Sequence, residues 1–292
     1  MVLGAGGMLG GMVARYCHQA NIPFLMMTRD GTAPDGLEGV TAFPFTAGVD
    51  SPVELLKQSG ATMVLNAVAV LNPMIDSADA NSVATAEQVN SLFPHELANA
   101  AQSCGARSLF ISTDAVFGLG ARKRSELDDP DASDIYGRSK RMGEPSGERV
   151  STLRCSVFGP EWVTHRSFLE RIRTLMPDAT LHGWRDHLYN GVSSLAIARL
   201  AAAILAGQFD PPPLMHFIPA DVVSKAELTQ LLARSFDRDD LSIETVDAPN
   251  GSSDRSLQSA DPERNLRAWA AAGYEGVPSI EELVVELGRW CS

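Results

Sequence analysis

Short apolar runs alternate with amphipathic stretches along the first half of the chain. Residues 24–28 (FLMMT), 40–45 and 62–70 (TMVLNAVAV) are almost continuously apolar, which predicts buried strands. Residues 52–59 and 84–104 have the apolar spacing of helices. Because strands and helices alternate, we expect right-handed βαβ units and a parallel sheet.

The pattern loosens in the second half of the chain. One more strand-like run occurs at residues 108–111. After about residue 155, helical spacing is clear only at residues 193–205, 225–236 and 280–290. We therefore predict the α/β class, with a Rossmann-type doubly wound parallel sheet and a smaller, less regular C-terminal substrate lobe.

A glycine-rich turn follows the first apolar residues. Residues 4–10 read GAGGMLG and lead into helical spacing that continues to about Ala20. In a first βα turn, glycines allow a tight bend and bring backbone N–H groups close to a pyrophosphate, and the helix N-terminus adds partial positive charge. The turn predicts an NAD(P)-binding unit at residues 1–155. We assign residues 156–292 mainly to substrate binding, with 190–207 returning to the first unit.

The end of the second predicted strand distinguishes the two nicotinamide cofactors. An acid there would bind the ribose 2′-hydroxyl, whereas an arginine accommodates a 2′-phosphate. Arg29 stands at this position and Asp30 follows it. We expect Arg29 to bind the phosphate and NADPH to be the cofactor, with NADH as the alternative.

Composition and charge exclude several classes of protein. The 24 Lys and Arg residues face 36 Asp and Glu residues, a formal charge of −12. So acidic a chain is expected to bind neither nucleic acid nor an anionic membrane surface. No apolar run approaches the roughly 20 residues that span a bilayer, and the N-terminal sequence lacks the basic flank of a signal peptide. We expect a cytoplasmic protein.

The cysteines and histidines do not predict a metal site. The four cysteines are far apart and form no CxxC pair, which indicates buried free thiols in a reducing compartment. The six histidines have neither HxxxH nor HExxH spacing. We therefore expect no metal.

A YxxxK element is the candidate for proton-transfer chemistry. Tyr136 and Lys140 stand four residues apart, so a helix would place both on one face. A nearby ammonium lowers a phenol pKa from about 10, and we expect Lys140 to act on Tyr136 in this way. Thr113 follows a predicted strand and offers a hydroxyl to a carbonyl oxygen, and Asn66 ends another strand at the edge where open sheets bind ligands.

These motifs together resemble the extended short-chain dehydrogenase/reductases, and most of all the dTDP-4-dehydrorhamnose reductase family. The resemblance covers nearly the whole chain. It rests on GAGGMLG at residues 4–10, NAVA at 66–69, ISTDAVF at 111–117 and YGRSKRMGE at 136–144. Weaker similarities to sugar-nucleotide reductases lie at Asn190–Ser194, Ser224–Lys225 and Asp254–Leu257.

The resemblance implies roles for matching positions. Thr113, Tyr136 and Lys140 would be catalytic, and Thr113, Asp114 and Tyr136 would face the sugar. The remaining implied residues would bind the cofactor together with Tyr136 and Lys140: Gly4, Gly7, Met8, Leu9, Gly10, Ala69, Val70 and Leu71.

The chain departs from the family pattern at the predicted sugar pocket. The family's Thr-Ser-Trp is here Cys155, Ser156 and Val157, so an aromatic wall is missing. Val70 and Leu71 replace polar residues beside the cofactor. These departures concern the identity of the sugar more than the type of reaction.

The resemblance implies an NADPH-dependent reductase of a nucleotide-linked 4-keto-6-deoxy sugar, in which hydride transfer is accompanied by proton donation from Tyr136. The expected partner is the nucleotide-sugar substrate, and a homodimer is compatible with the sequence. Two alternatives stay open. The same scaffold serves NAD(P)-dependent sugar-nucleotide epimerases and dehydratases, and some relatives are non-catalytic regulatory subunits that bind NADP.

Overall fold

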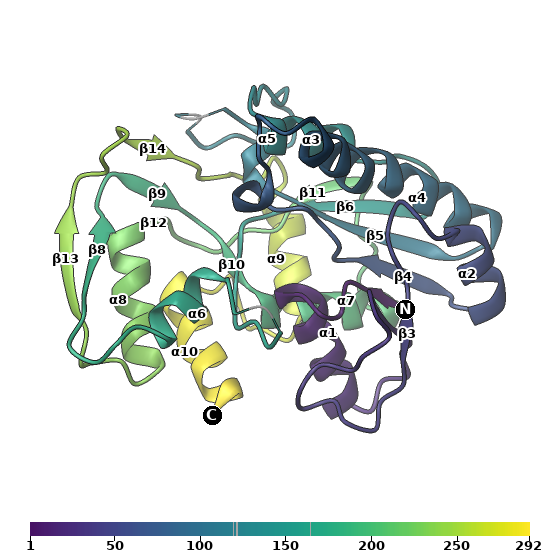
Figure 1. Cartoon of the computed structure of the whole chain (residues 1–292), viewed down its shortest axis with the longest axis horizontal. Coiled ribbons are helices and arrows are strands. Elements are labelled where there is room, and N and C mark those ends of the chain that lie inside the picture. Colours follow the sequence, from purple (N-terminus) through teal and green to yellow (C-terminus); the bar gives the residue numbers. More distant parts are fainter. Residues whose placement is uncertain (119, 121, 164) are drawn as a thin grey trace.

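A seven-stranded parallel sheet forms the centre of the molecule (Figure 1). The computed structural model describes residues 1–118, 120, 122–163 and 165–292. From one edge to the other the strands are β11 (Leu214–His216), β6 (Val150–Arg154), β5 (Arg107–Ser112), β4 (Met63–Asn66), β1 (Val2–Leu3), β2 (Met26–Thr28) and β3 (Ala42–Pro44). The order reverses at β1 and β4, so the sheet is doubly wound as predicted.

Helices cover both faces of this sheet (Figure 1). One face carries α1 (Met8–Gln19), α7 (Ser194–Leu205) and α9 (Pro262–Ala271); the other carries α2 (Pro52–Ser59), α3 (Ala80–Glu87), α4 (Phe93–Ser103) and α5 (Ile135–Met142). Because side chains alternate along a strand, Val2 and Met26 belong to one hydrophobic core and Leu3 and Met27 to the other. This two-sided burial explains the continuous apolar runs of the central strands.

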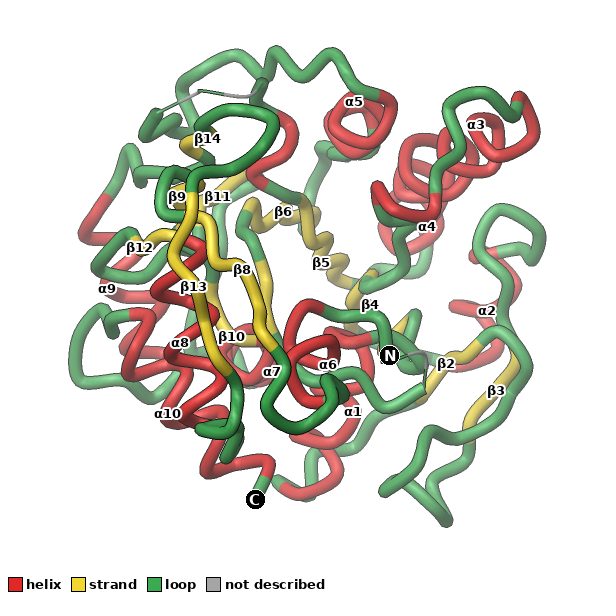
Figure 2. The backbone as a smooth tube through the Cα atoms, turned by 60° about the vertical axis from the view of Figure 1, so that its left-hand side comes forward, coloured by secondary structure: helices red, strands yellow, loops and turns green. Residues whose placement is uncertain are grey.

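The C-terminal lobe is built from short strands and three helices (Figure 2). Strand β8 (Thr180–Trp184) pairs in parallel with β13 (Ser242–Val246), β9 (His187–Tyr189) lies between β12 (Val223–Ser224) and β14 (Ser253–Asp254), and β7 (Val157–Phe158) pairs with β10 (Val192–Ser193). The helices are α6 (Phe168–Arg173), α8 (Lys225–Ser235) and α10 (Ile280–Cys291).

The chain returns from the lobe to the central sheet. Helix α7 packs along α1, and β11 then joins the edge of the sheet beside β6. The return therefore includes residues 214–216 as well as the predicted segment at 190–207. The division of the chain into two units at residue 155 stays a prediction.

Two predicted elements differ from the structure for local reasons. Strand β4 ends at Asn66 instead of continuing to residue 70, because the Asn66 side chain accepts the Val68 N–H at 3.1 Å and turns the chain. The single helix predicted at 84–104 is interrupted by a π-helical turn, η2 (Gln88–Leu92), between α3 and α4. This turn directs Asn90 inward, where it is 1% exposed.

The thiol groups are all free, but they are not all buried. Cys17 and Cys155 lie in the core, whereas Cys104 is half-buried and Cys291 is exposed. The prediction of buried thiols is therefore wrong for Cys291, which lies on the C-terminal turn of α10. Among the described helices, none combines the length and apolar character that a membrane crossing requires.

Candidate functional site

The carboxyl ends of four central strands meet along one edge of the sheet. The register aligns Leu3 with Asn66 and Ser112 with Arg154, so β1, β4, β5 and β6 end side by side. Open α/β sheets bind their ligands at this edge, near the point where the strand order reverses. The residues singled out in the sequence follow these strand ends.

The glycine turn lies directly after β1. Gly4 has a φ of +79°, a left-handed conformation that favours glycine. A Cβ on Gly10 would lie only 2.3 Å from the Gly4 carbonyl oxygen, so helix α1 approaches the turn as closely as backbone allows. Helix α1 begins at Met8 with no side-chain cap and no acid in its first turn. Its first N–H groups are therefore suited to a phosphate.

The end of β2 presents an arginine to solvent. Arg29 follows Thr28 and is exposed. The neighbouring Asp30 accepts the Thr32 N–H at 3.0 Å, and this hydrogen bond lowers the pKa of its carboxyl group. The Asp30 carboxylate is thus turned toward its own loop, and Arg29 is the positively charged group at this position.

Asn90 ties the segment after β4 to helix α5. Its side-chain oxygen accepts the Val70 N–H at 2.8 Å, and its amide nitrogen donates to the Val70 carbonyl at 2.9 Å and to Ser139 Oγ at 3.1 Å. The predicted cofactor-binding residues Ala69, Val70 and Leu71 are therefore held by their backbone. Polar side chains are not needed there to fix the segment.

Thr113 and Asp114 follow β5 and face Tyr136 of helix α5. The Thr113 hydroxyl donates to Asp114 Oδ1 at 2.9 Å and accepts the Ala115 N–H at 3.1 Å. Asp114 is 6% exposed. Its charge raises the pKa of Tyr136, and the neighbouring Thr113 side chain lowers it, so the three side chains share one environment.

The protonation of Tyr136 differs from the sequence-based expectation. Burial raises the pKa of Tyr136 to about 12, with Asp114 contributing in the same direction. The expected lowering by Lys140 is therefore wrong for the structure described. The physical reason is that desolvation of the phenolate outweighs the nearby positive charges. At neutral pH the phenol holds its proton, which is the form a general acid needs.

Lys140 lies one helical turn beyond Tyr136 and points toward β5. Its ammonium group donates a hydrogen bond to the Ile111 carbonyl at 2.9 Å, and the residue as a whole is 8% exposed. Burial lowers the pKa of Lys140 to about 8, while the charge of Glu144 raises it. Tyr136 and Lys140 thus lie on the same side of α5, as their spacing predicts.

Gly143 and Glu144, the last two residues of the YGRSKRMGE motif, hold α5 in place. Glu144 accepts two hydrogen bonds from Arg154, at 2.8 and 2.7 Å, and one from Ser112 Oγ at 2.5 Å. Gly143 leaves room for the η2 turn, since a Cβ there would lie 1.7 Å from the Asn90 carbonyl oxygen. These contacts join the ends of β5 and β6 to the helix that carries Tyr136.

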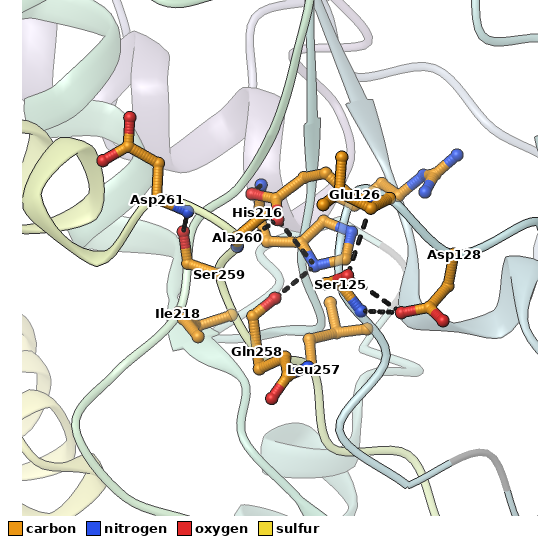
Figure 3. Close-up of polar contacts among 12 residues, drawn as sticks. Ser125, Glu126, Asp128, His216, Ile218, Leu257, Gln258, Ser259, Ala260 and Asp261 are labelled. Atoms are coloured by element: carbon orange, nitrogen blue, oxygen red, sulfur yellow. Dashed lines mark hydrogen bonds and ion pairs between the residues drawn. The ribbon is translucent and has the colours of Figure 1, made fainter.

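A second network fastens the loop before α5 to the C-terminal lobe (Figure 3). The two carboxylate oxygens of Glu126 accept the backbone N–H groups of His216 and Ala260, each at 2.7 Å. The buried His216 ring lies beside them, with Nδ1 2.8 Å from the Gln258 carbonyl oxygen. Burial lowers the pKa of His216. Asn190 holds the adjoining segment through both backbone groups of Leu257.

Three further residues of the site received no role from the sequence. Burial raises the pKa of the Tyr189 phenol well above its usual value, and the charge of Asp114 acts in the same direction. Arg255, in the segment after β14, lowers the pKa of Tyr136, and Lys225, at the start of α8, is itself influenced by the charges of Asp114 and Arg255. Their sequence neighbourhoods matched sugar-nucleotide reductases, but no local spacing connected them to Tyr136.

No cluster of three or more His, Cys, Asp or Glu side chains suited to a metal ion occurs within residues 1–118, 120, 122–163 and 165–292. The carboxylates at the sheet edge interact with other groups instead. Glu144 forms an ion pair with Arg154, and Asp114 accepts a hydrogen bond from Thr113 and raises the pKa of Tyr136.

Comparison with known proteins identifies a family. Residues 1–267 match the family described as RmlD substrate binding domain. A curated dTDP-4-dehydrorhamnose reductase from Mycobacterium tuberculosis is 28% identical over 219 residues, which is 70% of this chain. The match spans 64% of that relative, slightly less than two thirds of its length.

Solved structures share the fold at low sequence identity. A dTDP-4-dehydrorhamnose reductase from Clostridium acetobutylicum has a TM-score of 0.72 at 17% identity, covering 99% of this chain and 98% of that one. The Bacillus anthracis reductase in complex with NADP has a TM-score of 0.71 at 18% identity, covering 98% and 96%. A UDP-glucose 4-epimerase from Thermotoga maritima has a TM-score of 0.74 at 13% identity, covering 99% and 97%.

Proposed function

Because the chain belongs to the RmlD substrate-binding-domain family, we propose that it is an NADPH-dependent reductase of a nucleotide-linked 4-keto-6-deoxy sugar. One observation carries the proposal: Thr113 and Tyr136 share one environment at the carboxyl end of β5, with Lys140 bonded to the same strand. The similarity to the mycobacterial dTDP-4-dehydrorhamnose reductase supports the choice of substrate class.

The residues at the sheet edge fit a dinucleotide. The glycine turn and the uncapped start of α1 suit the pyrophosphate. Arg29 is exposed where a ribose 2′-phosphate would extend, which favours NADPH over NADH. The backbone of residues 69–71, fixed by Asn90, would line the ribose. The cofactor supplies a hydride to the keto carbon of the sugar when it is bound.

Side chains of the protein then donate the proton and bind the keto oxygen of the sugar. Tyr136 keeps its proton at neutral pH because burial raises its pKa to about 12, so it can donate to the oxygen that becomes the alkoxide. The Thr113 hydroxyl, now bonded to Asp114, can rotate to donate to the same oxygen. Lys140, bonded to the Ile111 carbonyl one helical turn beyond Tyr136, would hold the nicotinamide ribose.

Transfer of label from cofactor to sugar tests the proposal. The protein is incubated with NADPH deuterated on the hydride carbon and with dTDP-, UDP- or GDP-linked 4-keto-6-deoxy sugars, and the product is analysed by mass spectrometry. We expect one deuterium at the former keto carbon and one NADP⁺ formed for each sugar reduced. A sugar product without cofactor consumption would contradict the proposal and favour an epimerase or dehydratase.

The second alternative, a regulatory subunit that binds NADP without turnover, makes a different prediction. It requires cofactor binding with no labelled product from any sugar in the panel. The presence of Thr113, Tyr136 and Lys140 in one environment supports the catalytic interpretation over this alternative.

A further inference from the structure

Lys225 lies in the C-terminal lobe, with its ammonium group packed against aromatic rings. It is the first residue of α8, directly after the N-cap Ser224. Its ammonium nitrogen lies 3.8 Å from the centre of the Tyr189 ring and 5.5 Å from that of Phe168. A cation at this distance from an aromatic face is attracted by the ring.

This position does not favour a lysine for the stability of the helix. The N-terminus of a helix carries partial positive charge, so a cation in the first turn is less favourable than an acid. In addition, burial lowers the pKa of Lys225 to about 8, which shows that the charged form is poorly solvated there. A lysine at this position therefore lowers the stability of the folded protein unless its positive charge interacts with a ligand.

The hydrogen-bond donors of this ammonium group are not taken up by the protein. Within the described part of the chain, Lys225 Nζ has aromatic rings as close neighbours but no hydrogen bond or ion pair. An ammonium group has three N–H donors. An aromatic face attracts its positive charge but leaves these donors without strong hydrogen-bond acceptors. The charged groups that act on it are Asp114, which favours the ammonium form, and Arg255, which opposes it.

Asp114 places Lys225 near the reacting end of the site. The same carboxylate affects the pKa of Tyr136, Tyr189 and Lys225. Asp114 and Tyr189 thus connect Lys225 to the candidate site: the charge of Asp114 acts on both Lys225 and Tyr136, and the Lys225 ammonium lies over the Tyr189 ring. A donor, Lys225, and an acceptor, Asp114, in one electrostatic environment suit the hydroxyl groups of a sugar.

We propose that Lys225 donates a hydrogen bond to a hydroxyl or carboxylate oxygen carried by the sugar ring of the nucleotide-sugar substrate. Lys225 thereby selects sugars that carry such a group at that position. This inference rests on the proposed function. It assigns Lys225 to the sugar and not to the diphosphate, because the carboxylate of Asp114, which would repel a diphosphate, acts on both Lys225 and Tyr136. A sugar with a protonated amine facing Lys225 is disfavoured by charge repulsion.

Binding of matched ligands with and without the sugar tests the assignment. The wild type, Lys225→Met and the control Lys57→Met are titrated by calorimetry with dTDP-glucose, UDP-glucose, dTDP and UDP. Lys57 is exposed on α2, away from the site. We expect Lys225→Met to weaken binding of the preferred nucleotide sugar about 10- to 100-fold, the size of a charged hydrogen bond. Binding of the matching nucleoside diphosphate should change less than about threefold.

The possible results separate this inference from the proposed function. If Lys225→Met weakens the diphosphate and the nucleotide sugar equally, Lys225 contacts the diphosphate and the inference is wrong. If neither changes, it contacts no part of the ligand. If the wild type binds none of the four ligands, the proposed function fails and takes the inference with it.

A pH series on the wild type and on Lys225→Met provides a second readout, in which the shape of the pH dependence is compared instead of the affinity at one pH. Because the pKa of Lys225 is lowered to about 8, its ammonium form is lost between pH 7 and pH 9. Binding of the nucleotide sugar should weaken over this range more than binding of the diphosphate. Lys140 also has a pKa of about 8, so the part of the change that disappears in Lys225→Met reports Lys225. An identical pH dependence in both proteins would overturn the inference.

Discussion

At the scale of single residues, burial controls the chemistry of the site. Desolvation raises the pKa of Tyr136 to about 12 and lowers that of Lys140 to about 8. Both shifts favour the neutral form of the group. A neutral phenol that holds its proton at pH 7, next to a lysine that titrates just above it, is suited to donating a proton during a reduction.

Tyr136→Phe removes the proposed acid and little else. We expect kcat to fall about 100- to 10,000-fold, the usual contribution of general acid catalysis. The dissociation constant for NADPH should stay within about threefold, as measured by fluorescence titration. Tyr16→Phe, on helix α1 away from the site, serves as the control and should retain full activity. Retained turnover in Tyr136→Phe would remove this residue from the mechanism.

Arg29→Ala tests the choice of cofactor. An exposed arginine that contacts a phosphate contributes a charged hydrogen bond, so we expect NADPH binding to weaken about 10-fold. NADH binding should stay unchanged, because NADH lacks the 2′-phosphate. Arg122→Ala, also an exposed arginine, is the matched control. Equal weakening of both cofactors by Arg29→Ala would contradict the assigned contact.

The sequence predicts the proposed catalytic residues better than the lobe residues Lys225 and Arg255. Thr113 follows a strand, and Tyr136 and Lys140 share a helix, so local patterns bring them to one place. Lys225 lies 85 positions after Lys140 in the sequence, and only the packing of the lobe brings it to Asp114. The direction of the Tyr136 pKa shift was also predicted wrongly, because sequence spacing reveals a nearby charge but not the extent of burial.

At the scale of elements, helix α5 and the η2 turn act as one unit. The π-helical turn places Asn90 where it can bond Val70 on one side and Ser139 on the other. Gly143 ends α5 against the same turn. The positions of the predicted cofactor loop and of Tyr136 are thus coupled through Asn90.

Gly143→Ala should disturb this unit. The added Cβ would lie 1.7 Å from the Asn90 carbonyl oxygen, so one backbone must shift. We expect the free energy of unfolding to fall by about 1–3 kcal/mol, as for other overpacked sites, measured by urea denaturation. Gly276→Ala is the control because no atom lies within 4 Å of its Cβ position. A Gly143→Ala protein as stable as the control would show that the contact is relieved without cost.

The elements that could be predicted are long or continuously apolar. The parallel sheet and the helices α2, α7, α8 and α10 agree with the periodic patterns. The interruption of the helix predicted at 84–104 could not be predicted, since its cause is the hydrogen bonding of Asn90 to residues distant in sequence. The lobe strands β9, β12 and β14 have two or three residues each, too few for a period to be visible.

At the scale of the whole molecule, Glu126 joins the two parts of the site. Its carboxylate bonds β11 at His216 and the C-terminal segment at Ala260 (Figure 3). The loop that carries Glu126 leads to Tyr136, and the segment that it holds contains Arg255. The carboxylate of Glu126 therefore helps to fix the positions of both the loop that leads to Tyr136 and the segment that contains Arg255.

Glu126→Gln should loosen this connection. The amide keeps one acceptor and presents an NH₂ group to a backbone N–H, so one buried donor loses its partner. We expect a loss of about 1–3 kcal/mol in the free energy of unfolding. Glu263→Gln, at a side chain that is 90% exposed, should change stability by less than about 0.5 kcal/mol. If Glu126→Gln matches this control, the carboxylate does not hold the two parts together.

The oxidation of NADPH in the presence of keto sugars tests the central claim most directly. The purified protein is mixed with dTDP-, UDP- and GDP-linked 4-keto-6-deoxy sugars, with NADH in parallel reactions, and the loss of reduced-cofactor absorbance is followed. We predict turnover with at least one of these sugars and faster turnover with NADPH than with NADH. Absence of oxidation with every sugar, while NADP⁺ still binds, would contradict the account and identify a protein that holds the cofactor without reducing a sugar.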